Sequence, residues 1–374
     1  MKKRCIIHIP FSINENYAAA SQIRPMKMID AFKNIGYDVE VIKGDAKERK
    51  SKIHEVKDNI KKGIKYDFLY SESSTVPTLL TEKNHIPTHP LLDFDFMKFC
   101  KKNGIKIGLF YRDIHWRFDQ YKDNVSFFKR SVAYIFYYYD LFKYNNILDV
   151  MFLPSLEMKK FLPIKFKHKT FELPSGSDYI TSKPSKKSLD DKLNIFYSGG
   201  LGELYDLELI FKSISENENY TLTICCREAE WEENKKIYEK YMSDRIKIIH
   251  KKGKELDDEA VNADLLCLLI KPTPYWEFAM PMKLFYYLSH KKPILAINNT
   301  AAGNFVKKNN LGYVIDYKEE DMVSLLNNIF DERDTIKEKF NMDDIFKNNT
   351  WEARALEVEK LLLKKEEGEG IWRY

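Results

Sequence analysis

The chain of 374 residues has only five cysteines, and none of them falls in the spacing of a metal site. Most of them lie in short apolar runs, so we expect reduced thiols in the core of a cytoplasmic protein. No apolar stretch is long enough to span a bilayer, and the run after the basic N-terminus is too short for a signal peptide. The cysteines are Cys5, Cys100, Cys225, Cys226 and Cys267.

A large excess of one charge is also absent. Lys and Arg number 61 against 56 Asp and Glu, a net charge of +5. This balance does not require nucleic acid, for which no binding module is recognisable, but it suits anionic small molecules or a membrane surface. No Gly-x-Ser-x-Gly or Cys–His arrangement indicates a hydrolase. We expect no metal: His85 and His89 lack ligands at suitable spacing, and Asp93 and Asp95 begin a predicted helix.

What the sequence does contain is a regular alternation of short apolar runs and helical patterns. Near-continuous apolar strands between helices are typical of parallel sheets covered on both faces. The pattern predicts an α/β fold with two Rossmann-like domains, residues 1–175 and 190–342, joined by a linker at 174–191. A helical pattern is predicted at Pro25–Asn34. Residues 343–365 are predicted to be helical and are candidates for packing back on the first domain. Predicted strands are 4–9, 38–42, 66–70, 105–111, 148–153, 170–173, 193–197, 220–225, 245–249, 265–270, 293–297 and 312–315.

Two segments of the second half have the chemistry of an anion site. Gly199, Gly200 and Gly202 follow a predicted strand and precede a helix predicted at 204–215, where glycines let backbone amides approach a diphosphate. Pro281 opens a second short helix, whose free N–H groups and Lys283 would attract an anion. A tight turn and an ordinary helix–strand joint remain alternatives. The full dinucleotide fingerprint is absent, so we expect no nicotinamide cofactor.

Charged residues at other strand ends extend this hypothesis. Arg227 and Lys271 are further candidates for holding phosphate, with solvated surface charge as the alternative. Asp113 and His115 lie just past the strand predicted at 105–111, where such folds place chemistry. The alternative is an ion pair between Arg112 and Asp113, with His115 capping a turn.

Four strings, in order along the chain, carry a family resemblance. They are residues 21–41, Leu173-Pro-Ser-Gly-Ser-Asp178, Ile195-Phe-Tyr-Ser-Gly-Gly-Leu-Gly202 and Pro281-Met-Lys-Leu-Phe-Tyr-Tyr-Leu288. Together they resemble the bacterial group 1 (GT4-like) glycosyltransferases of the GT-B fold. The chain departs from that family at Tyr286, where relatives have a glutamate that holds the ribose hydroxyls. The family's Arg and Lys after the glycine loop are replaced by residues 203–206.

The resemblance implies two domains facing each other across a cleft, with the acceptor on the first and the donor on the second. It implies sugar transfer from a nucleotide-diphosphate sugar, a UDP-sugar being favoured, to a hydroxyl of a glycan, lipid-linked or glycoprotein acceptor. Retention, no metal and no cofactor beyond that co-substrate are implied too, and Asp113 or His115 would orient the acceptor. It adds Glu277, Phe278, Ala279, Met280 and Tyr286 to the donor site, and Tyr17, Ser21, Arg24 and Arg112 to the acceptor site.

Two alternatives and one surface remain open. The chain could be a nucleotide-sugar epimerase of the same architecture, or a degenerate GT-B subunit that stabilises an active partner. Residues 127–144 are rich in aromatic and basic side chains, and five lysines follow between 159 and 169. This composition suits the headgroup region of an anionic membrane, which would make the protein peripheral at the inner face. A long buried helix and a solvated lysine loop are the alternative interpretations.

Overall fold

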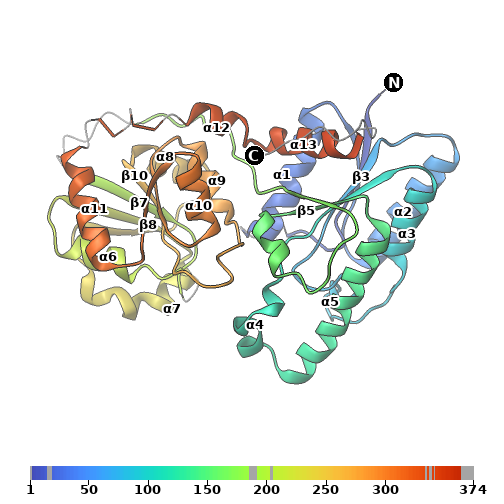
Figure 1. The fold of residues 1–374 in the computed structure, drawn as a ribbon, viewed down its shortest axis with the longest axis horizontal. Coiled ribbons are helices and arrows are strands. Elements are labelled where there is room, and N and C mark those ends of the chain that lie inside the picture. Colours follow the sequence, from blue (N-terminus) through green and yellow to red (C-terminus); the bar gives the residue numbers. More distant parts are fainter. Residues whose placement is uncertain are drawn as a thin grey trace. The chain divides into compact units, whose positions relative to one another are not determined.

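The structure is a computed structural model that describes residues 2–14, 19–184, 192–202, 205–332, 335–336, 339–340 and 342–363. The chain divides into two compact units. Unit 1 comprises Met1–Ser175 and the segment that begins at Trp351, and unit 2 comprises Gly176–Thr350. In each unit a parallel sheet is flanked by helices, as Figure 1 shows.

Unit 1 contains a six-stranded parallel sheet. Its strand order is β2-β1-β3-β4-β5-β6. Strand β2 lies on one side of β1, and β3 to β6 follow one another on the other side. The strand order therefore reverses between β1 and β3. The strands are β1 (Arg4–His8), β2 (Asp38–Ile42), β3 (Phe68–Glu72), β4 (Lys106–Phe110), β5 (Val150–Leu153) and β6 (Lys169–Glu172).

Two helical predictions in unit 1 were inaccurate. Helix α1 (Ala20–Asn34) begins five residues before Pro25, which lies inside the helix rather than at its start. The helix predicted at 343–365 is two helices, α12 (Asp343–Lys347) in unit 2 and α13 (Trp351–Leu363) in unit 1. Helix α13 packs on α1, β3 and β4. The other unit 1 helices include α2 (Ala46–Lys61), α3 (Leu92–Lys102), α4 (Asp119–Asn124) and α5 (Phe127–Ile147).

Unit 2 repeats this plan with a second six-stranded parallel sheet. Its order is β12-β11-β10-β7-β8-β9, so here the direction reverses between β7 and β10. The strands are β7 (Leu193–Ser198), β8 (Tyr220–Cys225), β9 (Ile246–Ile249), β10 (Leu265–Leu268), β11 (Ile294–Ile297) and β12 (Gly312–Ile315). The helices include α6 (Glu208–Ser215), α7 (Glu228–Tyr238), α8 (Lys254–Asn262), α9 (Met282–Ser289), α10 (Ala301–Lys308) and α11 (Glu319–Asp331). Every predicted strand is present, displaced by two residues or fewer at either end.

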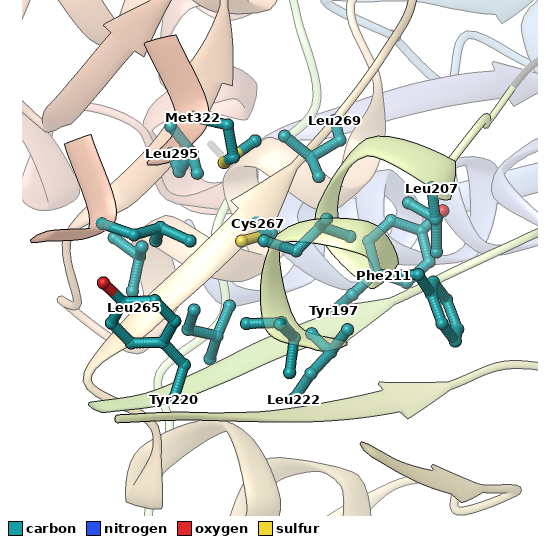
Figure 2. Packing of buried hydrophobic residues seen from close by; sticks show 14 of the residues in the cluster. Tyr197, Leu207, Phe211, Tyr220, Leu222, Leu265, Cys267, Leu269, Leu295 and Met322 are labelled. Atoms are coloured by element: carbon teal, nitrogen blue, oxygen red, sulfur yellow. The ribbon is translucent and has the colours of Figure 1, made fainter. Parts of the chain in front are cut away.

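The core of unit 2 lies between the sheet and the helices that cover it. Tyr197, Leu222 and Cys267 from three neighbouring strands meet Phe211 of α6 and Met322 of α11, as Figure 2 shows. All five are fully buried. Burying a large apolar side chain stabilises a fold by about 1.5–3 kcal/mol, so this cluster holds rigid the strand ends from which the glycine loop emerges.

Candidate functional site

Parallel sheets of this kind bind ligands beyond the carboxyl ends of the strands, where the strand order reverses. In unit 2 that place lies between β7 and β10. The glycine loop Gly199–Gly202 follows β7, and residues 269–281 follow β10 and lead into α9. The topology thus brings the two segments chosen from the sequence to the same edge of one sheet.

Gly199 and Lys283 are in direct contact at this edge. A Cβ atom on residue 199 would lie 2.3 Å from Lys283 Nζ, and the φ of +144° there also favours glycine. The ammonium group donates a hydrogen bond to Tyr197 Oη at 2.8 Å and lies 3.8 Å from the centre of the Tyr205 ring. The Tyr197 hydroxyl in turn donates to the Gly200 carbonyl at 2.6 Å. The absence of a side chain at Gly199 therefore lets Lys283 reach the loop.

Burial affects the charge of Lys283 directly. Desolvation lowers the pKa of its ammonium to about 7, and the nearby Glu230 carboxylate opposes this shift. An anion bound beside this lysine raises the pKa of its ammonium again, so anion binding and protonation of Lys283 favour each other. The charge of Lys283 therefore depends on whether an anion is bound.

Glu230 of α7 and Arg227, the residue that precedes this helix, approach the same loop. The Glu230 carboxylate oxygens would lie 3.6 and 3.7 Å from a Cβ atom on Gly200, and Arg227 pairs with Glu230 at 3.1 Å. Tyr205 packs 3.5 Å from the same point. Arg227 was predicted from the sequence as a phosphate-binding residue, whereas Glu230 was not. The spacing i, i+3 on a helix was the available signal, because it makes the two side chains neighbours.

The segment after β10 reaches this edge through a tight turn. Phe278 and Ala279 are buried, and their N–H groups both donate to the Tyr275 carbonyl, so the turn itself uses these two donors. Lys271 and Glu277 are exposed, and Met280 is partly buried. Pro281 precedes α9 as predicted, and the Leu284 N–H donates back to its carbonyl at 3.1 Å. The backbone N–H groups at this helix end that could donate to an anion are therefore those of Met282 and Lys283.

Tyr286 points toward α8. Its hydroxyl donates to Asp257 Oδ1 at 3.0 Å, and its ring packs at 4.6 Å against that of His290. His290 is buried, which lowers the pKa of its imidazole to about 4. The proton of the Tyr286 hydroxyl is therefore committed to Asp257 of α8.

In unit 1, Asp113 and His115 lie together in the loop after β4. Asp113 Oδ1 accepts a hydrogen bond from the His115 backbone N–H at 2.9 Å, and the ring Nδ1 lies 3.7 Å from the same carboxylate. The imidazole packs edge-on against Tyr121. The carboxylate therefore shapes the turn and orients the ring, and both side chains keep some exposure.

The two arginines assigned to the acceptor are held by the fold of unit 1. Arg112 pairs with Glu72 at 3.0 Å. Arg24 is buried, lies 3.2 Å from Glu72, and donates to the carbonyls of Leu173 and Pro174. These contacts tie α1 to the end of β6.

The two remaining acceptor candidates give less information. Ser21 lies partly exposed in the first turn of α1. Tyr17 lies outside the described residues.

Asp93, the first residue of the pair formed by Asp93 and Asp95, has a structural role. Asp93 accepts two hydrogen bonds from Arg49, at 2.9 and 3.0 Å, and contacts His8 Nε2 at 2.8 Å. All three side chains are buried. Over the described ranges, no group of three or more His, Cys, Asp or Glu side chains could hold a metal ion.

Comparisons with known proteins identify the fold. No family model matches the chain, and no curated protein does. Solved structures do match: sucrose-phosphate synthase from Thermosynechococcus elongatus (TM-score 0.63, 11% identity, 96% of this chain and 98% of that one) and a glycosyltransferase from Rickettsia africae (0.64, 12%, 98% and 100%). The Anabaena protein HepE in complex with UDP-glucose also matches (0.56, 10%, 95% and 99%). The predicted GT-B fold class is thereby confirmed.

Proposed function

We propose that the chain is a glycosyltransferase that transfers a sugar from a nucleotide-diphosphate sugar to an acceptor hydroxyl. The observation that carries the proposal is the contact of Lys283 with the glycine loop at the reversal point of the second sheet. Backbone amides at such a loop and a lysine beside them suit a diphosphate. The likeness in fold to a glycosyltransferase and to a protein solved with UDP-glucose favours a UDP-sugar as the donor.

In this proposal unit 2 holds the donor and unit 1 the acceptor. Lys283 stabilises the charge that develops on the leaving diphosphate, an electrostatic contribution that is often the largest in such reactions. Asp113 and His115 orient the acceptor hydroxyl, which is a hydroxyl of a glycan, lipid-linked glycan or glycoprotein glycan. Lys271, Glu277 and Met280 are secondary donor contacts.

Titration calorimetry of UDP, GDP, ADP and CMP, without added metal, tests the donor site. We expect one diphosphate to bind to the wild-type chain and to bind at least tenfold more weakly to Lys283→Ala, because a phosphate contact is lost. Lys308→Ala is the matched control, since Lys308 is an exposed lysine in the last turn of α10 and belongs to no proposed contact. If no nucleotide binds, the donor site is refuted, and a degenerate subunit that stabilises a partner becomes the better hypothesis.

Reaction assays test the remaining parts. With the nucleotide identified, Asp113→Ala should lower turnover while donor affinity stays the same. Retention predicts a product with the anomeric configuration of the donor, which proton NMR reads directly. Metal independence predicts full transfer in excess EDTA. An epimerase would instead convert the nucleotide sugar with no acceptor present.

A membrane partner is the last part of the proposal, and α5 supports it. Within the described residues, no helix combines the length and the apolarity needed to cross a bilayer. Helix α5, however, has two apolar faces. One is buried through Tyr137, Leu141 and Tyr144. The other exposes Phe128, Val132, Ile135, Tyr138 and Phe142, with 82% of Phe128 and 68% of Ile135 accessible to solvent.

The charges around this exposed face have one sign. The only acidic residue of α5, Asp140, is buried, whereas Lys129, Arg130 and Lys143 flank the exposed stripe. The last turn of α5 also contacts the lysine loop, residues 159–169. Asn145 Oδ1 accepts a hydrogen bond from the Lys167 N–H at 2.8 Å. Lys159, Lys165 and His168 line a cavity of about 320 Å³ in that loop. An apolar stripe with basic flanks fits an anionic bilayer.

Co-sedimentation with vesicles tests this surface. We expect binding to vesicles that contain phosphatidylglycerol and little binding to pure phosphatidylcholine. Ile135→Glu should reduce binding strongly, and Ile237→Glu, on the exposed surface of unit 2, should not. Equal binding of both variants, or concentration-dependent self-association lost in Ile135→Glu, would contradict a membrane role for α5.

A further inference from the structure

An acidic side chain occupies a place where the proposed ligand is itself anionic. The Glu230 carboxylate lies within 4 Å of a Cβ position on Gly200, and 77% of the side chain is covered. One of its oxygens, Oε2, is buried and has no hydrogen-bond partner among the described residues. Such a charge next to a phosphate-binding loop repels a phosphate.

The same carboxylate interacts with both positive groups of the loop. It pairs with Arg227 at 3.1 Å and supports the charge of Lys283. The attraction of each cation for an anionic ligand is therefore partly cancelled by Glu230. Each additional negative charge on the ligand is also repelled by the Glu230 carboxylate. The net attraction at the loop is smaller than two cations alone would produce.

We propose that Glu230 sets the charge preference of this site by disfavouring each further negative charge on the ligand. The inference rests on the proposed function. A nucleotide-diphosphate sugar carries a neutral group on its terminal phosphate, whereas the diphosphate left after transfer has one more ionisable oxygen. Glu230 then favours the substrate over the product and limits product inhibition.

Calorimetry with uridine, UMP and UDP, and with the adenosine and guanosine series in parallel, measures this preference at pH 7.5. Glu230→Gln keeps the shape of the side chain and removes its charge. The matched control is Glu232→Gln on the same helix, where Glu232 is 56% exposed and pairs with Lys235. Both variants change the net charge of the chain equally.

We expect the ratio of diphosphate to monophosphate affinity to rise about tenfold in Glu230→Gln and to change less than about twofold in Glu232→Gln. A wild-type chain that binds diphosphate, with the same ratio in both variants, would overturn the inference and leave the proposed function standing. No binding of any nucleotide by the wild type or by Glu230→Gln would overturn both. Unfolding curves for the three proteins confirm that each is folded.

Discussion

Gly199→Ala is the substitution that most directly tests the geometry of the glycine loop. The added methyl group would lie 2.3 Å from Lys283 Nζ and 2.8 Å from its Cε, so the lysine must leave its place. Backbone strain at this φ costs about 1–3 kcal/mol for a residue other than glycine. Loss of the hydrogen bond to Tyr197 and of the contacts with two aromatic rings adds about 1–3 kcal/mol. We therefore expect unit 2 to lose about 2–6 kcal/mol of stability.

Gly253→Ala provides the control for strain. Gly253 also has a positive φ, of 54°, but an added Cβ would meet nothing within 4 Å. The difference between the two variants isolates the displacement of Lys283. Hydrogen–deuterium exchange of β7 and β10 in increasing urea reports unit 2 alone, which matters because a chain with two units need not unfold in one step.

A double-mutant cycle makes this prediction refutable. In the Lys283→Ala background the methyl group at position 199 has no lysine to displace, so only the strain should remain. We expect the cost of Gly199→Ala to fall by about 1–3 kcal/mol in that background. If the cost is the same in both backgrounds, or equals that of Gly253→Ala, the contact between the loop and Lys283 does not hold the site.

Three further predictions concern titration and buried charge. UDP affinity should fall about fivefold from pH 7 to pH 8 and stay flat in Lys283→Met, because burial lowers the lysine pKa to about 7 and the anion must restore the proton; calorimetry at each pH measures it. Burial raises the pKa of Asp140 to about 7, so the folded state holds this proton more tightly than the unfolded state, and stability should fall by on the order of 4 kcal/mol as pH rises from about 4 to 7. Asp140→Asn should remove this slope in urea unfolding. Asp93→Asn should cost about 3–5 kcal/mol in the same assay, since it removes the buried carboxylate that pairs with Arg49 at 2.9 Å, whereas Asp95→Asn, at an exposed pair, should cost less than about 1 kcal/mol.

The strands were predictable because a strand buried on both faces must be a continuous apolar run. The helices were less so. Pro25 suggested a helix start, yet α1 already begins at Ala20. The predicted tail helix breaks at Asn349 and Thr350 because their backbone pairs with Ser177, whose N–H donates to the Asn349 carbonyl at 2.7 Å. A partner more than 150 residues away leaves no local signal.

In the candidate site too, residues with a local sequence signal were predictable and residues with distant contacts were not. Gly199 and Lys283 were selected from local sequence because a loop after a strand and the first turn of a helix have recognisable residues. The contacts of Arg24 were not predictable for the opposite reason: its carbonyl partners lie 149 and 150 residues along the chain, and nothing near it in sequence indicates them. The side chains that adjust the charge of the site, Glu230 and Tyr205, depend on how α7 and the loop pack together.

The groups that attract phosphate could be identified from local sequence. How strongly they attract it depends on charged and aromatic side chains that only the fold brings near them. Lys283 is buried beside two tyrosine rings, and this desolvation lowers the pKa of its ammonium although Glu230 opposes the shift. Replacing Glu230 should therefore act in two opposite ways: it removes a repulsion from the ligand, and it removes support for the lysine charge. Because the ligand supplies its own negative charge to Lys283, the first effect should dominate when a diphosphate is bound, and the second should appear in the empty protein as a still lower lysine pKa.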